Sequence, residues 1–429
     1  MIDNTFERKR LLAQLREEKI ARRKLLKAFG SAGLAAAALP LLGRGALADE
    51  AGKQTGPGGL ALARPDKPVT LPLYEDPIKS GLAPETGGTF KVFNYQDYID
   101  KDLLTSFGKL YNVEVELTTF DSMDQCITRL ATHGVAPDVS DITPDRLDQA
   151  VAGKLIKPIN KDYIPNLQAN VWPSLHSPFY DVGSQYGVPY TIYKTGIGWR
   201  DDKISEDIPN LPNPWSIFWN SQKYSGYVGV LDDARESLTM AMCYRGQYDI
   251  NTEDPALIEA ALNDLKALIP ICNPKINITE YQTLPQGNAW LHQSWSGDLL
   301  GAFVFYLPKG DDGSHLRFWG APKGKGPIQN DTFAICSTTT KPVLAHLFLN
   351  YILDKDVAYG NFINFTGYQP PQVSITAESL LEKKVIPKNL ENVILTSDDA
   401  GVGSMQEMTL TPKGQALWQS AYARFNSGT

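Results

Sequence analysis

Acidic side chains at short spacings are the residues of this sequence best suited to chemistry. Asp233 and Glu236 lie three residues apart, and Asp298 follows Trp295 at the same spacing. An aspartate before a helix with a glutamate three residues later also has the arrangement of a capping box, and Asp298 has the position of a cap for residues 299–303. Paired carboxylates also suit general acid–base chemistry. A carboxylate-based hydrolase, a cation-binding site and simple helix caps are therefore all open interpretations.

Sequence signatures of catalysis are absent. The chain has no G-x-S-x-G elbow, no H-E-x-x-H and no C-x-x-C, and its five histidines are scattered. Residues 324–326 do not form a P-loop, no G-x-G-x-x-G follows a strand, and residues 354–356 lack the rest of a calcium loop. We therefore expect no cofactor, no bound metal and no enzymatic activity.

Alternating strand and helix patterns are expected to position the acidic residues. Strands are predicted at 90–93, 113–117, 138–142 and 227–231, and helices at 99–110, from 121, from 233, from 252 and from 342. Such alternation indicates parallel strands covered by helices. Tyr95 and Tyr98 follow the first strand at its carboxyl end, where ligands bind in α/β folds. Packing on the next helix is the alternative role for these two rings.

Length and charge limit the class of protein. A chain of 429 residues favours two domains over one. Residues 1–48 hold ten of the 41 basic and four of the 48 acidic residues, so the remainder has 31 basic and 44 acidic residues and a net charge of −13. An acidic body does not suit nucleic acid, whose phosphates need lysine and arginine. It is compatible with a cationic ligand, or with solubility alone.

The N-terminus has the pattern of an export signal. Arg22 and Arg23 precede an apolar run over 28–42, and 46–48 supply the small residues of a cleavage site. The paired arginines resemble a twin-arginine signal, and no cysteine follows for a lipid anchor. We therefore predict a signal peptide at 1–48, a Gly/Pro-rich linker or surface arm at 49–87, and a periplasmic mature protein. Cys243 and Cys272 could pair by a disulfide after export.

Several segments in order resemble the spermidine/putrescine-binding proteins of bacterial ABC importers. They are 94–98 (NYQDY), 186–190 (YGVPY), 231–236 (LDDARE), 295–298 (WSGD), 350–353 (NYIL), 354–358 and 367–368. The resemblance implies an α/β, two-lobed periplasmic binding protein of type II, with hinge crossovers and mixed, mainly parallel sheets. It implies one lobe at 88–191 plus 330–375 and another at 192–329 plus 376–429.

The resemblance also implies the ligand site. A polyamine needs carboxylates for its ammonium groups and aromatic faces for its methylene chain. The expected ligand-binding residues are Tyr95, Tyr98, Thr143, Asp145, Asp233, Glu236, Trp295, Asp298, Asp331 and Tyr368. The expected role is a monomeric receptor that closes on a putrescine- or spermidine-like amine and delivers it to an inner-membrane ABC permease.

Three positions depart from the family pattern. Gln329 stands where relatives carry a tryptophan, and Asp145 stands where they carry an aromatic residue. Lys194, next to the predicted hinge, would repel a polyamine if it pointed into the cleft and could pair with a ligand carboxylate. A zwitterionic amine, such as an amino acid, 4-aminobutyrate or an opine-like compound, is therefore an alternative ligand. An exported carboxylate-based hydrolase is the alternative from another class.

Overall fold

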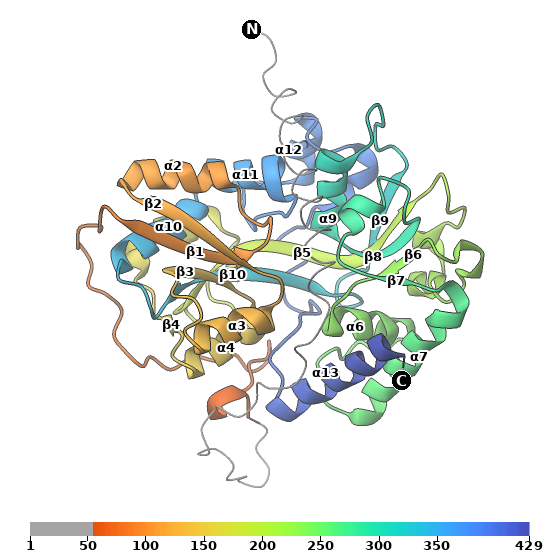
Figure 1. Ribbon diagram of the computed structural model, residues 1–429, viewed down its shortest axis with the longest axis horizontal. Coiled ribbons are helices and arrows are strands. Elements are labelled where there is room, and N and C mark those ends of the chain that lie inside the picture. The colour runs from red at the N-terminus through yellow and green to blue at the C-terminus, as the bar shows by residue number, and fades with distance from the viewer. Residues whose placement is uncertain (1–54, 429) are drawn as a thin grey trace.

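The computed structural model describes residues 55–428, and one sheet runs through it (Figure 1). Its strands are β1 (Thr89–Tyr95), β2 (Glu114–Phe120), β3 (Val139–Ile142), β4 (Ile156–Lys157), β5 (Gly187–Arg200), β6 (Val228–Val230), β7 (Lys275–Ile276), β8 (Leu291–Trp295), β9 (Leu316–Gly320) and β10 (Ile328–Cys336). Their order is β2-β1-β3-β10-β5-β8-β6-β7, with β4 beside β10 and β9 beside β5. The predicted signal peptide (1–48) and residues 49–54 of the predicted arm lie outside the described residues.

Helices cover both faces of this sheet. They are α2 (Lys101–Tyr111), α3 (Met123–Ala131), α4 (Pro144–Ala152), α5 (Pro165–Asn170), α6 (Ala234–Tyr244), α7 (Pro255–Cys272), α8 (Glu280–Thr283), α9 (Ser296–Gly301), α10 (Pro342–Ile352), α11 (Lys355–Asn361), α12 (Ala377–Glu382) and α13 (Pro412–Ser427). In Figure 1, α2, α11 and α9 lie above the sheet, and α3, α4, α6 and α13 lie below it. In the described part of the chain, no helix combines the length and apolar character needed to cross a membrane.

Helix starts follow local sequence signals. Pro255 and Pro342 occupy first helical positions, where the missing N–H of proline leaves no donor unpaired. The Asp233 side chain accepts hydrogen bonds from the backbone N–H groups of Arg235 and Glu236, so it caps α6. The predicted cap at Asp233 is therefore present.

Two long strands carry the chain between the halves of the sheet. Residues 187–194 of β5 pair with β10, and residues 195–200 pair with β8 and β9. Parallel pairs join β1 to β2 and β3, and β6 to β7 and β8, whereas every pair of β5 and β10 is antiparallel. The expected mixed sheet is confirmed. Parallel pairs do not dominate it, because the crossing strands have antiparallel neighbours on both sides.

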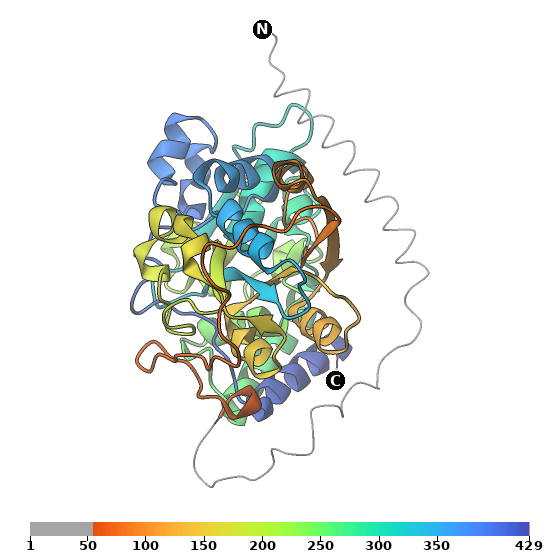
Figure 2. The ribbon, with the colours of Figure 1, turned by 90° about the vertical axis from the view of Figure 1, so that its left-hand side faces the viewer.

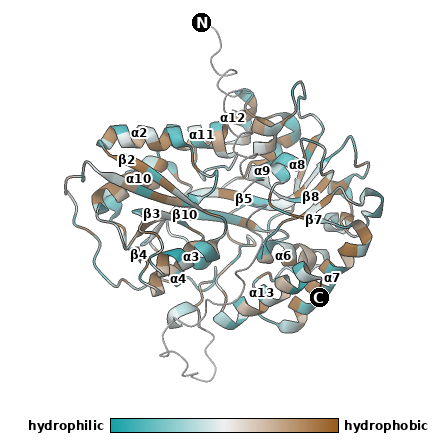
Figure 3. Cartoon of the chain, in the orientation of Figure 1, coloured by the Kyte–Doolittle hydropathy of each residue, from teal (hydrophilic) through white to brown (hydrophobic). Residues whose placement is uncertain are grey.

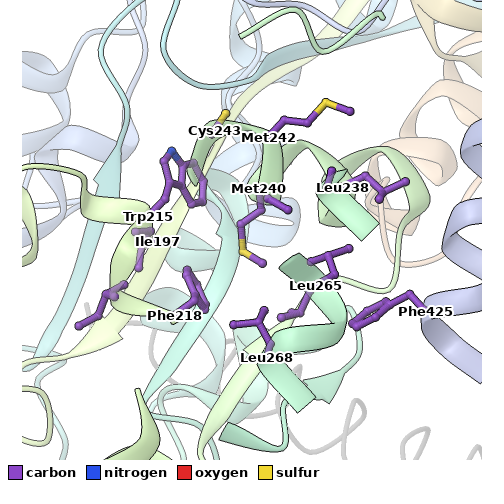
Figure 4. Close-up of a cluster of buried hydrophobic side chains, with 14 of the residues drawn as sticks. Ile197, Trp215, Phe218, Leu238, Met240, Met242, Cys243, Leu265, Leu268 and Phe425 are labelled. Carbon is purple, nitrogen blue, oxygen red and sulfur yellow. The ribbon is translucent and has the colours of Figure 1, made fainter. Parts of the chain in front are cut away.

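Separate hydrophobic clusters fill the two sides of the molecule. One side has clusters around Phe90 and Phe333 and around Phe93 and Phe120. The other has a cluster built on α6, α7 and α13, which includes Trp215, Leu265 and Phe425 (Figure 4). Hydrophobic colouring along β1 and α7 in Figure 3 marks segments that contribute to these clusters. Each half therefore has its own core, with β5 and β10 between them.

The segment predicted as a linker or surface arm packs against the body of the molecule. The N-terminal arm, residues 55–87 of the described chain, runs over the first half of the molecule (Figure 2) and buries Ala63 and Leu71 in its core. Its Val69 exchanges backbone hydrogen bonds with Phe179 and Val182.

Cys243 and Cys272 are buried free thiols on α6 and α7, so the disulfide considered from the sequence is not present.

Candidate functional site

The first carboxylate of the candidate site is Asp331, on β10. The Tyr98 hydroxyl donates a hydrogen bond to Oδ2 of Asp331 at 2.6 Å, and the Thr191 hydroxyl donates to the same atom at 3.1 Å. Only 4% of Asp331 is exposed. Burial raises its pKa to about 6, although the bonds from Tyr98 and Thr191 lower it. Asp331 lies within the strand β10.

A second carboxylate, Glu236, lies on the other side of the crossing strands. Its Oε1 accepts hydrogen bonds from Trp295 Nε1 at 2.7 Å and from the Thr195 hydroxyl at 2.8 Å. Its Oε2 is buried without a hydrogen-bond partner among the described residues. Burial, together with the nearby charge of Asp233, raises the pKa of Glu236 to about 7. The Glu236 side chain therefore turns toward Trp295 and leaves the helix cap to Asp233.

Asp298 forms a third centre with Tyr368. Asp298 lies within α9, so it does not cap the following segment as the sequence allowed. Its carboxyl group lies near the Tyr368 hydroxyl and the carboxyl group of Glu280, and it interacts electrostatically with both. Burial raises the pKa of Asp298 to about 6. Gly297 allows this arrangement, because a Cβ there would lie 2.5 Å from the Tyr368 ring.

Aromatic rings connect the three carboxylates. The ring centroids of Tyr95 and Tyr98 are 6.0 Å apart, and those of Tyr98 and Tyr368 are 5.0 Å apart. Tyr193, on β5, continues the chain at 5.5 Å from Tyr368 and 6.3 Å from Trp295. The structure thus brings together seven predicted residues: Tyr95, Tyr98, Glu236, Trp295, Asp298, Asp331 and Tyr368.

Three predicted residues lie at the helix N-termini beside this centre. Asp233 caps α6 and is exposed. Thr143 stands at the N-cap position of α4, yet its side chain makes no cap bond and its hydroxyl is buried without a partner among the described residues. Asp145 forms an ion pair with the neighbouring Arg146 at 3.2 Å.

Four residues near the site were missed from the sequence: Asp141, Tyr193, Glu280 and Glu407. Asp141 and Glu280 are fully buried. Glu407 is half-buried, its Oε1 has no partner among the described residues, and burial raises its pKa well above the ordinary value. An aspartate inside the apolar strand 139–142 was the one available signal, because a charge is rarely placed there without a role.

Positive side chains near these acids are engaged elsewhere. The Arg235 guanidinium donates to the carbonyl of Ile250 and to Asn251, and it lies over the Trp418 ring. Among the described residues, no ion pair involves Asp331, Glu236 or Asp298. The three centres therefore combine buried carboxylates and aromatic faces without a resident cation, which is the chemistry of an organic-amine site.

Lys194 and Gln329 are the two departures whose orientation was open. Lys194 Nζ lies 2.6 Å from Oδ1 of Asp399, so its charge is neutralised by that residue. Gln329 pairs with Tyr193 across β10 and β5, and its amide nitrogen is buried without a partner among the described residues. Neither residue brings an unpaired positive charge to the carboxylates. Among residues 55–428, no group of three or more His, Cys, Asp or Glu side chains is arranged to hold a metal ion.

Comparisons with known proteins identify the family to which the chain belongs. Residues 102–388 match the family described as bacterial extracellular solute-binding protein. The spermidine/putrescine-binding periplasmic protein of Escherichia coli K12 is 28% identical over 303 residues, which cover 70% of this chain and 82% of that protein. The putrescine/cadaverine-binding protein of Pseudomonas aeruginosa is 25% identical over 277 residues, covering 61% of this chain and 74% of that protein.

Solved structures show the same fold. The spermidine/putrescine ABC transporter substrate-binding protein PotD of Streptococcus pneumoniae superposes with a TM-score of 0.62 at 22% identity, covering 80% of this chain and 99% of that chain. The binding protein MotA of A. tumefaciens B6, in complex with glucopine, has a TM-score of 0.55 at 15% identity, covering 79% of this chain and 99% of that chain. At these identities the likeness establishes the two-lobed binding-protein fold.

Proposed function

Because the chain belongs to the bacterial extracellular solute-binding protein family, we propose that it is the periplasmic polyamine receptor of an ABC importer. Relatives named for spermidine, putrescine and cadaverine support a polyamine as the ligand. In this role the protein binds the amine between its lobes and delivers it to an inner-membrane permease. It performs no reaction on the ligand.

The buried, unpartnered Oε2 of Glu236 is the observation that carries this proposal. A carboxylate oxygen taken out of water without a donor is unfavourable until a cation reaches it. An ammonium group placed there would form charge-assisted hydrogen bonds, while Trp295 and Tyr193 present ring faces to the methylene chain. A second ammonium would reach Asp331, at the other end of the aromatic chain.

Closure of two lobes explains how one ligand uses both ends. The proposed lobes are residues 88–191 plus 330–375 and residues 192–329 plus 376–429, with β5 and β10 as crossovers. Leu395 and Ala400 are an exception to this division, because they pack in the core of the first lobe although Leu390 before them and Met405 after them pack with the second. A ligand that bonds Asp331 in one lobe and Glu236 in the other favours the closed state over the open one.

We also propose that the protein is exported to the periplasm. Residues 1–48 would act as a twin-arginine signal peptide, and the mature protein would be free in the periplasm without a lipid anchor. A monomer would suffice, because Tyr98, Asp331, Glu236 and Trp295 all come from one chain.

A competition assay distinguishes this function from its alternatives. Radiolabelled spermidine is bound first, and unlabelled putrescine, 4-aminobutyrate and lysine are then added as competitors. The polyamines should displace the label at far lower concentrations than the zwitterions, because only they present ammonium groups without a carboxylate. Spermidine recovered after prolonged incubation should have its original mass. Preferential displacement by a zwitterion would change the ligand class, and a changed mass would indicate an enzyme.

A further inference from the structure

Each proposed lobe contains a fully buried carboxyl group beside one of the proposed ligand-binding carboxyls. These rear and front carboxyls are Asp141 and Asp331 in the first lobe, and Glu280 and Asp298 in the second. Asp141 and Glu280 have no exposed surface, whereas Asp331 is 4% and Asp298 is 7% exposed. The rear carboxyls lie on β3 and α8, two elements that differ from those carrying the front carboxyls.

Neither oxygen of Asp141 has a hydrogen-bond partner among the described residues. Asp141 pairs with Phe333 across β3 and β10, two residues from Asp331 on the same strand. The titratable groups that face it are Asp331 from β10, Tyr95 and Tyr98 from the end of β1, Tyr190 from β5 and Cys126 from α3. None of these groups is a cation, and without a cation nearby a buried carboxyl in such surroundings favours its protonated form.

The Glu280 carboxyl group lies close to that of Asp298, and burial together with the nearby charge of Asp298 raises the pKa of Glu280. Two buried carboxyl groups in such proximity are most stable when one of them carries a proton. Oε1 of Glu280 accepts from the backbone N–H of Trp295 at 3.4 Å, and Oε2 has no partner among the described residues. The other titratable groups around it are Tyr281, on α8, and Tyr368. Here too, no cation faces the pair.

We propose that Asp141–Asp331 and Glu280–Asp298 are proton-exchanging carboxyl pairs, each of which holds one proton in the empty receptor and releases it to solvent when an ammonium group binds. The exchange balances charge, because one H⁺ leaves each pair as one positive ligand charge arrives. This inference rests on the proposed function for the identity of the ligand, but the proton in the empty site does not depend on it. Asp141 and Glu280 act as positioning residues through their partners.

The exchange has a physical cause. Without a ligand, two negative charges in one buried pair would repel each other in a medium of low polarity. A proton removes one of the charges. An ammonium beside the front carboxylate supplies the positive charge instead, so the proton is no longer favoured. Binding should therefore weaken as the medium becomes acidic, because the ligand must then displace protons from both pairs.

Net charge tests the proton in the empty receptor. Capillary electrophoresis of the ligand-free protein near neutral pH compares the wild type with Asp141→Asn and Glu280→Gln. Both variants should migrate with the wild type, because each replaces a group that is already neutral. Asp398→Asn is the matched control, since that side chain is 89% exposed and its loss should move the band by one charge. A shift of one full charge for Asp141→Asn or Glu280→Gln would overturn the proposal for that pair.

Asp141→Val provides a second variant, which avoids placing the polar amide of Asp141→Asn in a buried position. Valine is apolar and β-branched, so it suits a buried strand position and has no polar atom to satisfy. It should also migrate with the wild type. If Asp141 were ionised, Asp141→Val would shift like the Asp398→Asn control.

Calorimetry tests the release. Spermidine is titrated into each protein in buffers of different ionisation enthalpy, which gives the number of protons released per ligand bound. Asp141→Asn and Glu280→Gln should each release one proton fewer than the wild type, while Asp398→Asn should match it. An unchanged number would overturn the exchange. If the wild type bound no polyamine, the proposed function and the exchange would both fail, and the electrophoresis would still decide separately whether the pairs hold protons.

Discussion

Asp331 and Glu236 are the two residues that the proposed ligand must bridge. Removal of one buried partner of a charge pair should weaken binding by about 2–5 kcal/mol, or about 30-fold or more in Kd. We therefore expect Asp331→Ala to lose at least that much affinity for spermidine in a calorimetric titration. Asp398→Ala, which changes an exposed acid, serves as the control. An affinity of Asp331→Ala close to that of the wild type would remove Asp331 from the site.

Lys194 gives a prediction of the opposite kind. Its ammonium group is paired with Asp399, and a partly exposed ion pair contributes about 1 kcal/mol or less to stability. Lys194→Met should therefore leave the affinity for spermidine nearly unchanged and lower the thermal midpoint only slightly. A large gain in polyamine affinity in the same titration would mean that Lys194 repels the ligand in the wild type.

Among individual residues, the sequence indicated the proposed ligand-binding side chains but not the fully buried carboxyls beside them. Glu236 and Trp295 could be selected because they stand in recognisable segments, and Asp331 because the resemblance to the family implies it. Asp141 and Glu280 could not, because burial of an acid depends on which strands and helices cover it. That information comes from pairings between residues far apart in the chain.

At the scale of elements, α9 and the segment after α11 form one packed unit. A Cβ on Gly297 would lie 2.5 Å from the Tyr368 ring, whereas the nearest atom to a Cβ on Gly301, in the same helix, is 3.7 Å away. Gly297→Ala should therefore displace Tyr368, move its hydroxyl away from Asp298 and weaken spermidine binding by an order of magnitude or more. Gly301→Ala should bind normally. Equal affinities of the two variants would show that the position of Tyr368 is unimportant.

Sequence signals predicted where elements begin better than how they pair. The cap at Asp233 and the prolines at 255 and 342 are local features, so they could be read directly. The length of β5 could not be predicted from such local features. Its second half passes close to β9, where a Cβ on Gly196 would lie 2.1 Å from the Trp319 carbonyl oxygen. A strand with three glycines gains its order from partners that lie about 100 residues away.

At the scale of the whole molecule, buried acids should make stability depend on pH. Burial raises the pKa of Glu236 to about 7 and those of Asp298 and Asp331 to about 6, from ordinary values of 4.5 and 3.8. The folded protein therefore holds protons that the unfolded chain has already lost between about pH 4 and 7. In this window the free energy of unfolding should fall as pH rises, by about 1.4 kcal/mol per pH unit for each extra proton held.

Denaturant unfolding of the ligand-free protein at pH values across this range measures the effect. The stability should be greatest at the acidic end of the window and decline toward neutral pH. Spermidine should offset the decline, because it binds the deprotonated carboxylates of the folded state. Stability that rose steadily from pH 4 to 7 without ligand would contradict the assignment of raised pKa values to these groups.

Calorimetric titration of the protein with spermidine near neutral pH is the most direct test of whether the protein is a polyamine receptor. We expect one ligand per chain, a Kd in the micromolar range or tighter, and proton release on binding. Absence of heat and of any stabilisation with spermidine and putrescine alike would contradict the polyamine receptor.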